Sequence, residues 1–144
     1  MKLEDLQSEW ANDAHINHQA LVSESAKVPL LHSKYYKILI EEKGLLLLLR
    51  SKQEDLELLL EGFFAKTLTQ AELTKHNLVY GEKRVLKADS SKYISTHPKM
   101  VELTLKIGVQ LEKVKFIEDI IKLIHSRNFT IKNMIDVKKF EAGI

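Results

Sequence analysis

An apolar repeat over residues 98–126 is the feature that most constrains the fold of this chain. Its members recur at alternating steps of three and four, interrupted only by the polar Gln110: Met100, Leu103, Ile107, Val114, Ile117, Ile121 and Ile124. This period is that of an α-helix packed along another helix. His97-Pro98 marks the start, because proline at a first helical position loses no needed hydrogen bond. A second line of apolar residues lies beside the first and consists of Leu105, Val109, Phe116, Ile120 and Leu123. We therefore expect this helix to be packed against other parts of the protein on two sides.

Helix-breaking residues are sparse in the rest of the chain, with two prolines and five glycines among 144 residues. This scarcity predicts an all-α fold of two long helices plus short amphipathic helices. Residues 2–10 form the first short helix. From residue 17 to Gly62 we predict a short helix, a break or kink near Pro29, and then a long helix with Gly62 as its cap.

Capping signals place the remaining helix ends. Thr69 and Glu72 have the spacing of a capping box, which predicts a short helix beginning at Thr69. Asp89 is expected to cap another short turn. Asn128 is expected to break the long helix, and a closing amphipathic helix then ends at Gly143.

Five successive leucines interrupt the amphipathic pattern of the first long helix. On an α-helix they turn through roughly 400°, so they present apolar surface on every side. Self-association would hide such surface, whereas the alternative is a central helix in a compact monomer. We therefore predict an oligomer interface formed by these leucines and by the heptad repeat: Leu45, Leu46, Leu47, Leu48, Leu49, Met100, Leu103, Ile107, Val114, Ile117, Ile121 and Ile124.

Charge is distributed unevenly along what we take to be a single helical domain over residues 1–144. The net charge is +2, but residues 1–72 carry 8 basic and 12 acidic side chains and residues 73–144 carry 14 and 8. The first half is thus acidic and Leu-rich, and the second is basic and contains the heptad helix. Without cysteine, a signal region or a membrane-length apolar stretch, the sequence predicts a soluble protein of a reducing compartment.

Residue patterns typical of enzymes are weak here. His15 and His18 have a ligand-like spacing, but a third ligand is missing, and Glu57 with Glu61 has no Glu-x-x-His partner. Phosphate-binding glycine patterns are absent from the sequence. We therefore predict a protein that is not an enzyme and has no catalytic residues, metal or cofactor.

Basic residues interleaved with aromatic ones point instead to nucleic acid. From Lys83 to Lys99 the basic side chains outnumber a single acid, Asp89; Tyr93 lies among them and Tyr80 lies just before them. Cations neutralise phosphates and aromatic rings stack on bases, which suits single strands. Such runs are also common on solvated helix faces. The DNA-binding candidates are Lys66, Lys83, Arg84, Lys87, Lys92, Arg127 and Lys132, with Phe63, Phe64 and Tyr93 as stacking candidates.

Several segments resemble one known family from end to end and in register. They are the opening MKLEDLQSEW, LHSKYYKIL from Leu31, VLKAD from Val85 and SRNFTIKNMIDVKKFEAG from Ser126. The chain is similar to the UvsY recombination mediators of large tailed (myovirus) phages. The resemblance implies a ring-like homo-oligomer, hexamer or heptamer, in the host cytoplasm. Its partners would be single-stranded DNA, the phage single-strand-binding protein and a phage RecA-like recombinase that it loads.

One stretch departs from the family pattern, in which a basic Leu-Lys-rich segment precedes a tyrosine pair. The matching residues 56–64 have Leu58 and Leu60 at the basic positions and Phe63-Phe64 at the tyrosines. Three interpretations compete: the DNA site has moved to residues 83–87, the two phenylalanines stack without charge, or packing has replaced binding. We favour the first, because the basic half is intact.

The function predicted from the sequence is therefore a recombination mediator. Two alternatives stay open, a structural scaffold oligomer without DNA binding and a small adaptor that binds a partner through the acidic half.

Overall fold

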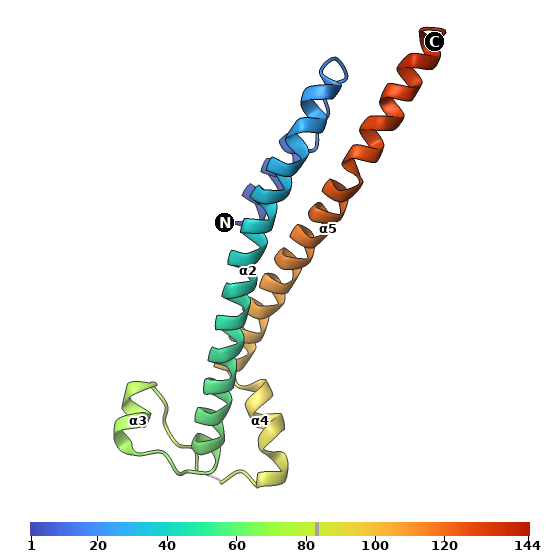
Figure 1. Cartoon of the computed structure of the whole chain (residues 1–144). Helices are drawn as coiled ribbons and strands as arrows, with labels where there is room; N and C mark the ends of the chain where they lie inside the picture. Colours follow the sequence, from blue (N-terminus) through green and yellow to red (C-terminus); the bar gives the residue numbers. More distant parts are fainter. Residues whose placement is uncertain (83) are drawn as a thin grey trace. The chain divides into compact units, whose positions relative to one another are not determined.

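The computed structural model describes residues 1–82 and 84–144, and within these ranges it is helical with no strand. The elements are α1 (Leu3–Asp13), α2 (Leu21–Phe64), α3 (Gln70–Lys75), the 3₁₀ turn η1 (Lys87–Asp89), α4 (Ser90–Thr96) and α5 (Pro98–Glu141) (Figure 1). The all-α prediction with two long helices is confirmed. None of the helices in this part of the chain is long and apolar enough to cross a membrane.

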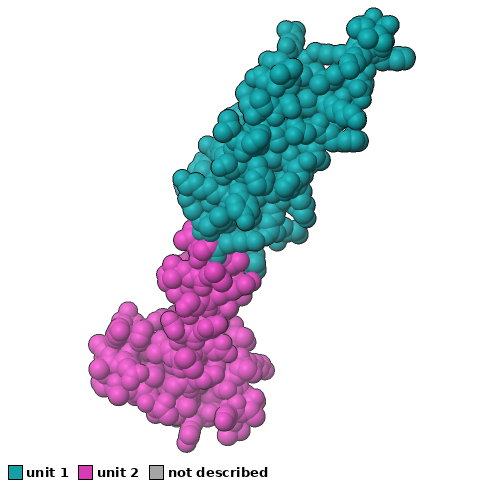
Figure 2. Space-filling model, viewed as in Figure 1, with its two compact units in different colours: residues 1–43, 111–144 teal, residues 44–110 magenta. Residues whose placement is uncertain are grey.

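The chain divides into two compact units, shown in Figure 2. Unit 1 consists of residues 1–43 and 111–144, and unit 2 of residues 44–110. Each long helix contributes one part to each unit. The sequence predicted a single domain whose acidic and basic halves meet at residue 72. That boundary describes how charge is distributed along the sequence, whereas the two units reflect which residues pack together.

Unit 1 is built from α1 and from antiparallel parts of α2 and α5. Glu42 of α2 pairs with Lys113 of α5 at 3.3 Å, and Lys43 pairs with Glu118 at 3.1 Å. Tyr35 is fully buried, its hydroxyl donates to Asp13 at 2.8 Å, and its ring meets Trp10 edge-on. Burial, followed by this contact with the carboxylate, raises the pKa of Tyr35. The apolar core of unit 1 includes Leu6, Leu21, Leu39, Val114, Ile117, Ile120, Ile121, Ile124 and Ile131.

The heptad repeat is packed inside the single chain, which corrects its assignment to the oligomer interface. Met100 and Ile107 are buried in unit 2, Val114, Ile117, Ile121 and Ile124 are buried in unit 1, and Leu103 is half-buried. The repeat found the correct helix face. The mistake concerned its partner, because a heptad pattern packs equally well against a helix of the same chain.

The second apolar line of α5 is the more exposed one. Leu105, Val109 and Leu123 are 66%, 61% and 55% exposed, whereas Ile120 is buried. In the leucine run only Leu46 is buried, and Leu45, Leu47 and Leu48 are exposed. The leucine run therefore presents apolar side chains to solvent, as expected for five successive residues on a helix. The prediction of an oligomer depends on this exposed surface.

The predicted break at Asn128 is wrong, since α5 continues through it, and α2 likewise continues through Pro29, which excludes the break there but leaves the kink a prediction. Proline removes one helical hydrogen bond, at about 3 kcal/mol, and packing on both sides of it can outweigh that loss. Asparagine costs a helix only about 0.7 kcal/mol. Here the Asn128 side chain accepts a hydrogen bond from Ser25 Oγ at 3.1 Å, which ties it to α2 within unit 1.

Candidate functional site

Unequal charge between the units locates the candidate site. Unit 1 carries 12 basic and 12 acidic residues, whereas unit 2 carries 10 basic and 8 acidic residues. Within unit 2 the segment between the long helices, residues 65–97, has six basic and three acidic side chains. The net positive charge of the protein therefore arises from this connecting segment.

A cluster of aromatic rings surrounds the end of α2 in the same unit. Phe63 and Phe64 are half-buried and their ring centroids lie 5.1 Å apart. Phe63 stacks on Tyr80 at 5.7 Å, and Phe64 meets Tyr93 at 5.7 Å. Both phenylalanines meet His97 at 6.2 Å. The three predicted stacking residues are thus brought together, and Tyr93, at 49% exposed, is the most accessible of them.

The end of α2 is formed by Lys66 and not by Gly62, which corrects the predicted cap. Lys66 has φ = 56°, its N–H donates to the Phe63 carbonyl at 3.2 Å, and the Thr67 N–H donates to the Gly62 carbonyl at 2.9 Å. This is the hydrogen-bond pattern of a Schellman motif. Gly62 instead lies in close contact with Leu68, since a Cβ there would be 2.9 Å from Leu68 Cδ2 and the leucine side chain would have to shift.

Local hydrogen bonds hold the connecting segment in place. The predicted capping box is confirmed: the Glu72 N–H donates to Thr69 Oγ1 at 3.2 Å, and the Glu72 carboxylate accepts from the Thr69 N–H. Tyr80 donates its hydroxyl to the Leu68 carbonyl at 2.9 Å, and Lys99 Nζ donates to the carbonyl of His76. Asp89 precedes α4 as predicted, but its side chain makes no capping hydrogen bond.

His97 connects the aromatic cluster to α5. Its Nδ1 accepts a hydrogen bond from the Lys99 N–H at 3.2 Å, so the ring caps the first turn of the helix that begins at Pro98. Burial, and then the nearby charge of Lys99, lower the pKa of His97 below its ordinary value of 6.5. An acceptor nitrogen has to be unprotonated, which agrees with this direction.

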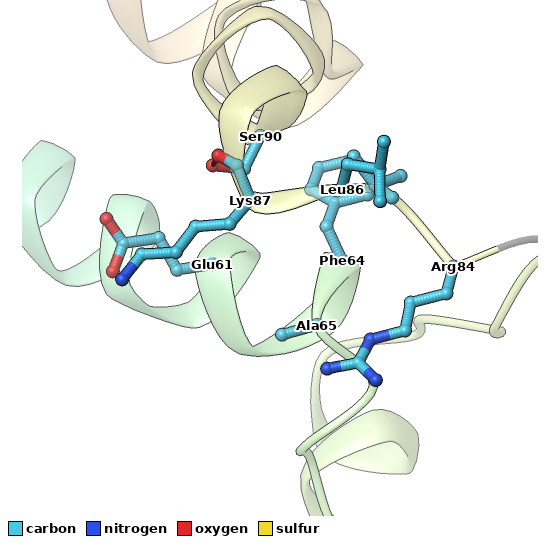
Figure 3. A pocket seen from close by; sticks show the side chains of 8 residues that line it. Glu61, Phe64, Ala65, Arg84, Leu86, Lys87 and Ser90 are labelled. Carbon is cyan, nitrogen blue, oxygen red and sulfur yellow. Dashed lines mark hydrogen bonds between the residues drawn. The ribbon is translucent and has the colours of Figure 1, made fainter.

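A cavity of about 460 Å³ opens between the last turn of α2 and the segment that leads into α4 (Figure 3). Its lining combines an apolar floor with charged groups, namely Glu61, Phe64, Ala65, Arg84, Val85, Leu86, Lys87 and Ser90. The Lys87 side chain extends toward Glu61, and the Arg84 guanidinium lies beyond Ala65. Ser90 Oγ donates to the Lys87 carbonyl at 2.8 Å, which fixes the turn at η1.

The structure brings most of the predicted basic residues into unit 2. Lys66, Arg84, Lys87 and Lys92 are all exposed there, and Lys66 Nζ lies 3.4 Å from the Glu82 carbonyl. Lys83 lies outside the described residues. Lys132 is exposed on α5 in unit 1. Arg84 and Lys87 are the two of these that line the cavity.

Arg127 does not belong to this set, and its assignment as a DNA-binding residue is corrected. It is 6% exposed, and its guanidinium donates to Glu24 Oε2 at 3.1 Å and to the carbonyls of Ala14 and His15. Burial raises the pKa of Glu24, but the hydrogen bonds and charges of Arg127 and Lys27 outweigh it, so that pKa is lowered. Arg127 therefore joins α5 to α2 and to the end of α1 inside unit 1.

Three residues of the site were absent from the predicted set. Glu61 was considered only as half of a carboxylate pair, although it lines the cavity. Tyr80 and His97 complete the aromatic cluster through contacts across the chain. The run of aromatic residues among basic ones was a usable signal for Tyr80, whereas Glu61 and His97 required the fold.

Fold and site together define a small all-α protein in which a basic, aromatic-rich segment connects two long helices. A family model described as "Recombination, repair and ssDNA binding protein UvsY" matches residues 9–144. The chain therefore belongs to the UvsY family, as its sequence resemblance predicted.

Solved structures of the bacteriophage T4 recombination mediator protein UvsY have the same fold. One crystal form matches with a TM-score of 0.84 and 22% identity, over 99% of this chain and 98% of that one. A second form matches with a TM-score of 0.82 and 20% identity, over 95% and 98%. Among curated protein sequences, none matches this chain.

Proposed function

We propose that this protein binds single-stranded DNA through the basic, aromatic segment of unit 2. The observation that carries the proposal is the cavity at the end of α2, where Arg84 and Lys87 stand beside Phe64. Cations beside accessible rings suit a single strand, because the cations neutralise phosphates while the rings stack on unpaired bases. The family description, which names recombination, repair and ssDNA binding, supports the same partner.

The finer role we propose is that of a recombination mediator. A homo-oligomeric ring, hexamer or heptamer, would present the basic segment several times and hold one strand by avidity. Binding many phosphates would weaken the grip of a bound single-strand-binding protein and allow a phage RecA-like recombinase to load, in the host cytoplasm. This role requires no catalytic residue, cofactor or metal. Its support is the membership of the UvsY family.

Exposed apolar residues support the oligomer. Leu45, Leu47 and Leu48 in unit 2 are between 47% and 67% exposed, and Leu123 in unit 1 is 55% exposed. Burying such groups between subunits contributes about 25 cal/mol per Å² of apolar surface. The same observation favours the second candidate function, a structural oligomer without DNA binding.

A salt series separates the two functions. Fluorescence anisotropy of a labelled dT oligomer should show binding that weakens steeply as salt rises, with a slope of about −0.7 for each neutralised phosphate. The variant Arg84→Gln/Lys87→Gln should flatten the slope by about 1.4. Absence of binding at low salt would refute the proposed function and leave the functions without DNA binding.

The matched control is Lys115→Gln/Lys122→Gln, which removes two exposed charges from α5 in unit 1. It should leave the slope unchanged, and light scattering should give the same mass for all three proteins. An equal loss of slope in the control would show that binding follows net charge and not the proposed segment.

A further inference from the structure

We propose that the cavity at the end of α2 receives one base of the bound strand and prefers a base with an exocyclic amino group, such as cytosine or adenine, over thymine. The inference rests on the proposed function, because it concerns the strand that the same segment binds. It adds a pocket for a single base and a chemical reason for base preference. Both follow from the residues around the cavity.

The size and floor of the cavity suit a flat aromatic ring. Its volume of about 460 Å³ lies within the roughly 300–1,000 Å³ of typical small-ligand pockets. Phe64 lines it together with Ala65, Val85 and Leu86. Contacts with Phe63, Tyr93 and His97 hold the Phe64 ring in position. An unstacked base placed on this floor exchanges water for an aromatic surface, which is the contact that single-strand-binding proteins use.

The charged rim suits the phosphate that comes with the base. Arg84 and Lys87 are exposed at the cavity, and neither takes part in an ion pair within the described residues. Both cations can therefore contact a phosphate without first breaking a salt bridge. The two side chains extend in different directions from the floor in Figure 3, so they can reach phosphates on either side of an inserted base.

Glu61 gives the pocket its chemical preference. An ionised carboxylate only accepts hydrogen bonds, and it lines the cavity opposite the segment that carries Lys87. Cytosine N4 and adenine N6 donate hydrogen bonds, whereas thymine presents the O4 acceptor at the same edge. A carboxylate in a DNA-binding segment also repels phosphate, so its contribution is to selectivity and not to affinity. Thymine can donate only its N3–H, which lies between the O2 and O4 acceptors, so the carboxylate would meet a repelling carbonyl oxygen beside that donor.

The test compares dC and dT oligomers of equal length, with binding to the full-length protein measured by fluorescence anisotropy at low salt. We expect the protein to bind dC about 10-fold more tightly, the range of one hydrogen bond to a charged group. Glu61→Gln should bring the dC to dT ratio close to one, because an amide both donates and accepts. Its affinity for dT should rise as the negative charge is removed.

Glu57→Gln is the matched control, since Glu57 is exposed one turn earlier on α2 and does not line the cavity. It should keep the dC preference of the unmodified protein. As a second variant, Phe64→Leu keeps an apolar floor without a ring. It should weaken binding of both oligomers at least 5-fold and leave the salt slope unchanged.

Four outcomes would overturn the inference. Equal affinities for dC and dT, or a preference that survives Glu61→Gln, would refute the base pocket while salt-dependent binding keeps the proposed function. A Phe64→Leu variant with normal affinity would do the same. Absence of binding to either oligomer would refute the proposed function and the pocket together.

Discussion

Replacement of Arg127 by methionine should destabilise the protein strongly without changing how it binds DNA. In unit 1 the Arg127 guanidinium pairs with Glu24, and the two side chains are only 6% and 7% exposed. Methionine keeps much of the volume but leaves the Glu24 carboxylate buried without its main partner. The carbonyls of Ala14 and His15 lose their donors as well.

The expected loss follows from these contacts. Removal of one partner from a buried ion pair costs about 3–5 kcal/mol. Lys27 also pairs with Glu24, at 3.4 Å, but its side chain is 57% exposed and offsets only a part. We therefore expect the lower end of the range, about 3 kcal/mol, which corresponds to a fall in Tm of about 6–12 °C for a chain of this size.

The assay is urea denaturation followed by circular dichroism, with Glu24→Leu/Arg127→Met as the control. The double variant removes both charges, so it should lose less than half as much free energy of unfolding. Because the pKa of Glu24 is lowered in the fold, the stabilisation by the pair is present above its ordinary value of 4.5 and is lost as pH falls through the folded pKa. The difference in free energy of unfolding between Arg127→Met and the unmodified protein should therefore become smaller at acidic pH.

DNA binding provides the refuting result. If Arg127 contacted a phosphate, Arg127→Met would flatten the salt slope by about 0.7 and leave stability nearly unchanged. That pair of results would show that the buried ion pair does not represent the protein in solution. An unchanged slope with a large loss of stability would establish Arg127 as a packing residue.

Three further predictions concern other parts of the fold. Lys66→Gly should stabilise the protein by about 1 kcal/mol in urea denaturation, because glycine adopts the positive φ of this position at no steric cost; a loss would mean that the Lys66 side chain outweighs the strain. Ile117→Ala, at a fully buried position, should lower the free energy of unfolding by about 2–5 kcal/mol. Leu123→Ala, at an exposed position, should have little effect on unfolding, but it should reduce the mass measured by light scattering if this face of α5 forms the ring. The folded pKa of His97 is lowered, so its contribution to the free energy of unfolding should be fully present above its ordinary pKa of 6.5 and should be lost below it, as pH falls through the lower folded pKa. His97→Asn, which keeps a cap that does not titrate, should show a flatter pH profile in urea denaturation.

Periodicity predicted the helices well because it depends on one face of one element. The heptad repeat identified the buried side of α5, and the Thr69–Glu72 spacing identified a capping box that the structure confirms. Helix ends that lack a capping motif in the sequence were harder to predict. Lys66 takes the position usually held by glycine, and Asn128 stays helical because a tertiary hydrogen bond stabilises it.

The site was predictable only in part, because charge and exposure are different properties. The sequence grouped Arg84, Lys87 and Arg127 as equivalent cations. The fold separates them, since Arg127 meets a carboxylate 103 residues away whereas the other two remain exposed at the cavity. A partner so distant in the sequence leaves no local pattern. The cavity was unpredictable for the same reason, because the residues that line it come from two segments that are separate in the sequence.

The two leucines at the positions where the family pattern has basic residues have different consequences. Leu60 is fully buried in the core of unit 2 with Ile94 and Met100, so a cation there would require a different packing. Leu58 is 68% exposed, and it is the position at which a surface charge is missing. Of the two positions on α2 where the family pattern has a basic residue, only Leu58 could therefore carry a charge at the surface. Arg84 and Lys87 supply two exposed cations at the cavity that begins one turn further on, at Glu61. Because both cations and the Phe64 ring belong to unit 2, a DNA site centred on residues 84–87 needs no basic residue at either leucine position.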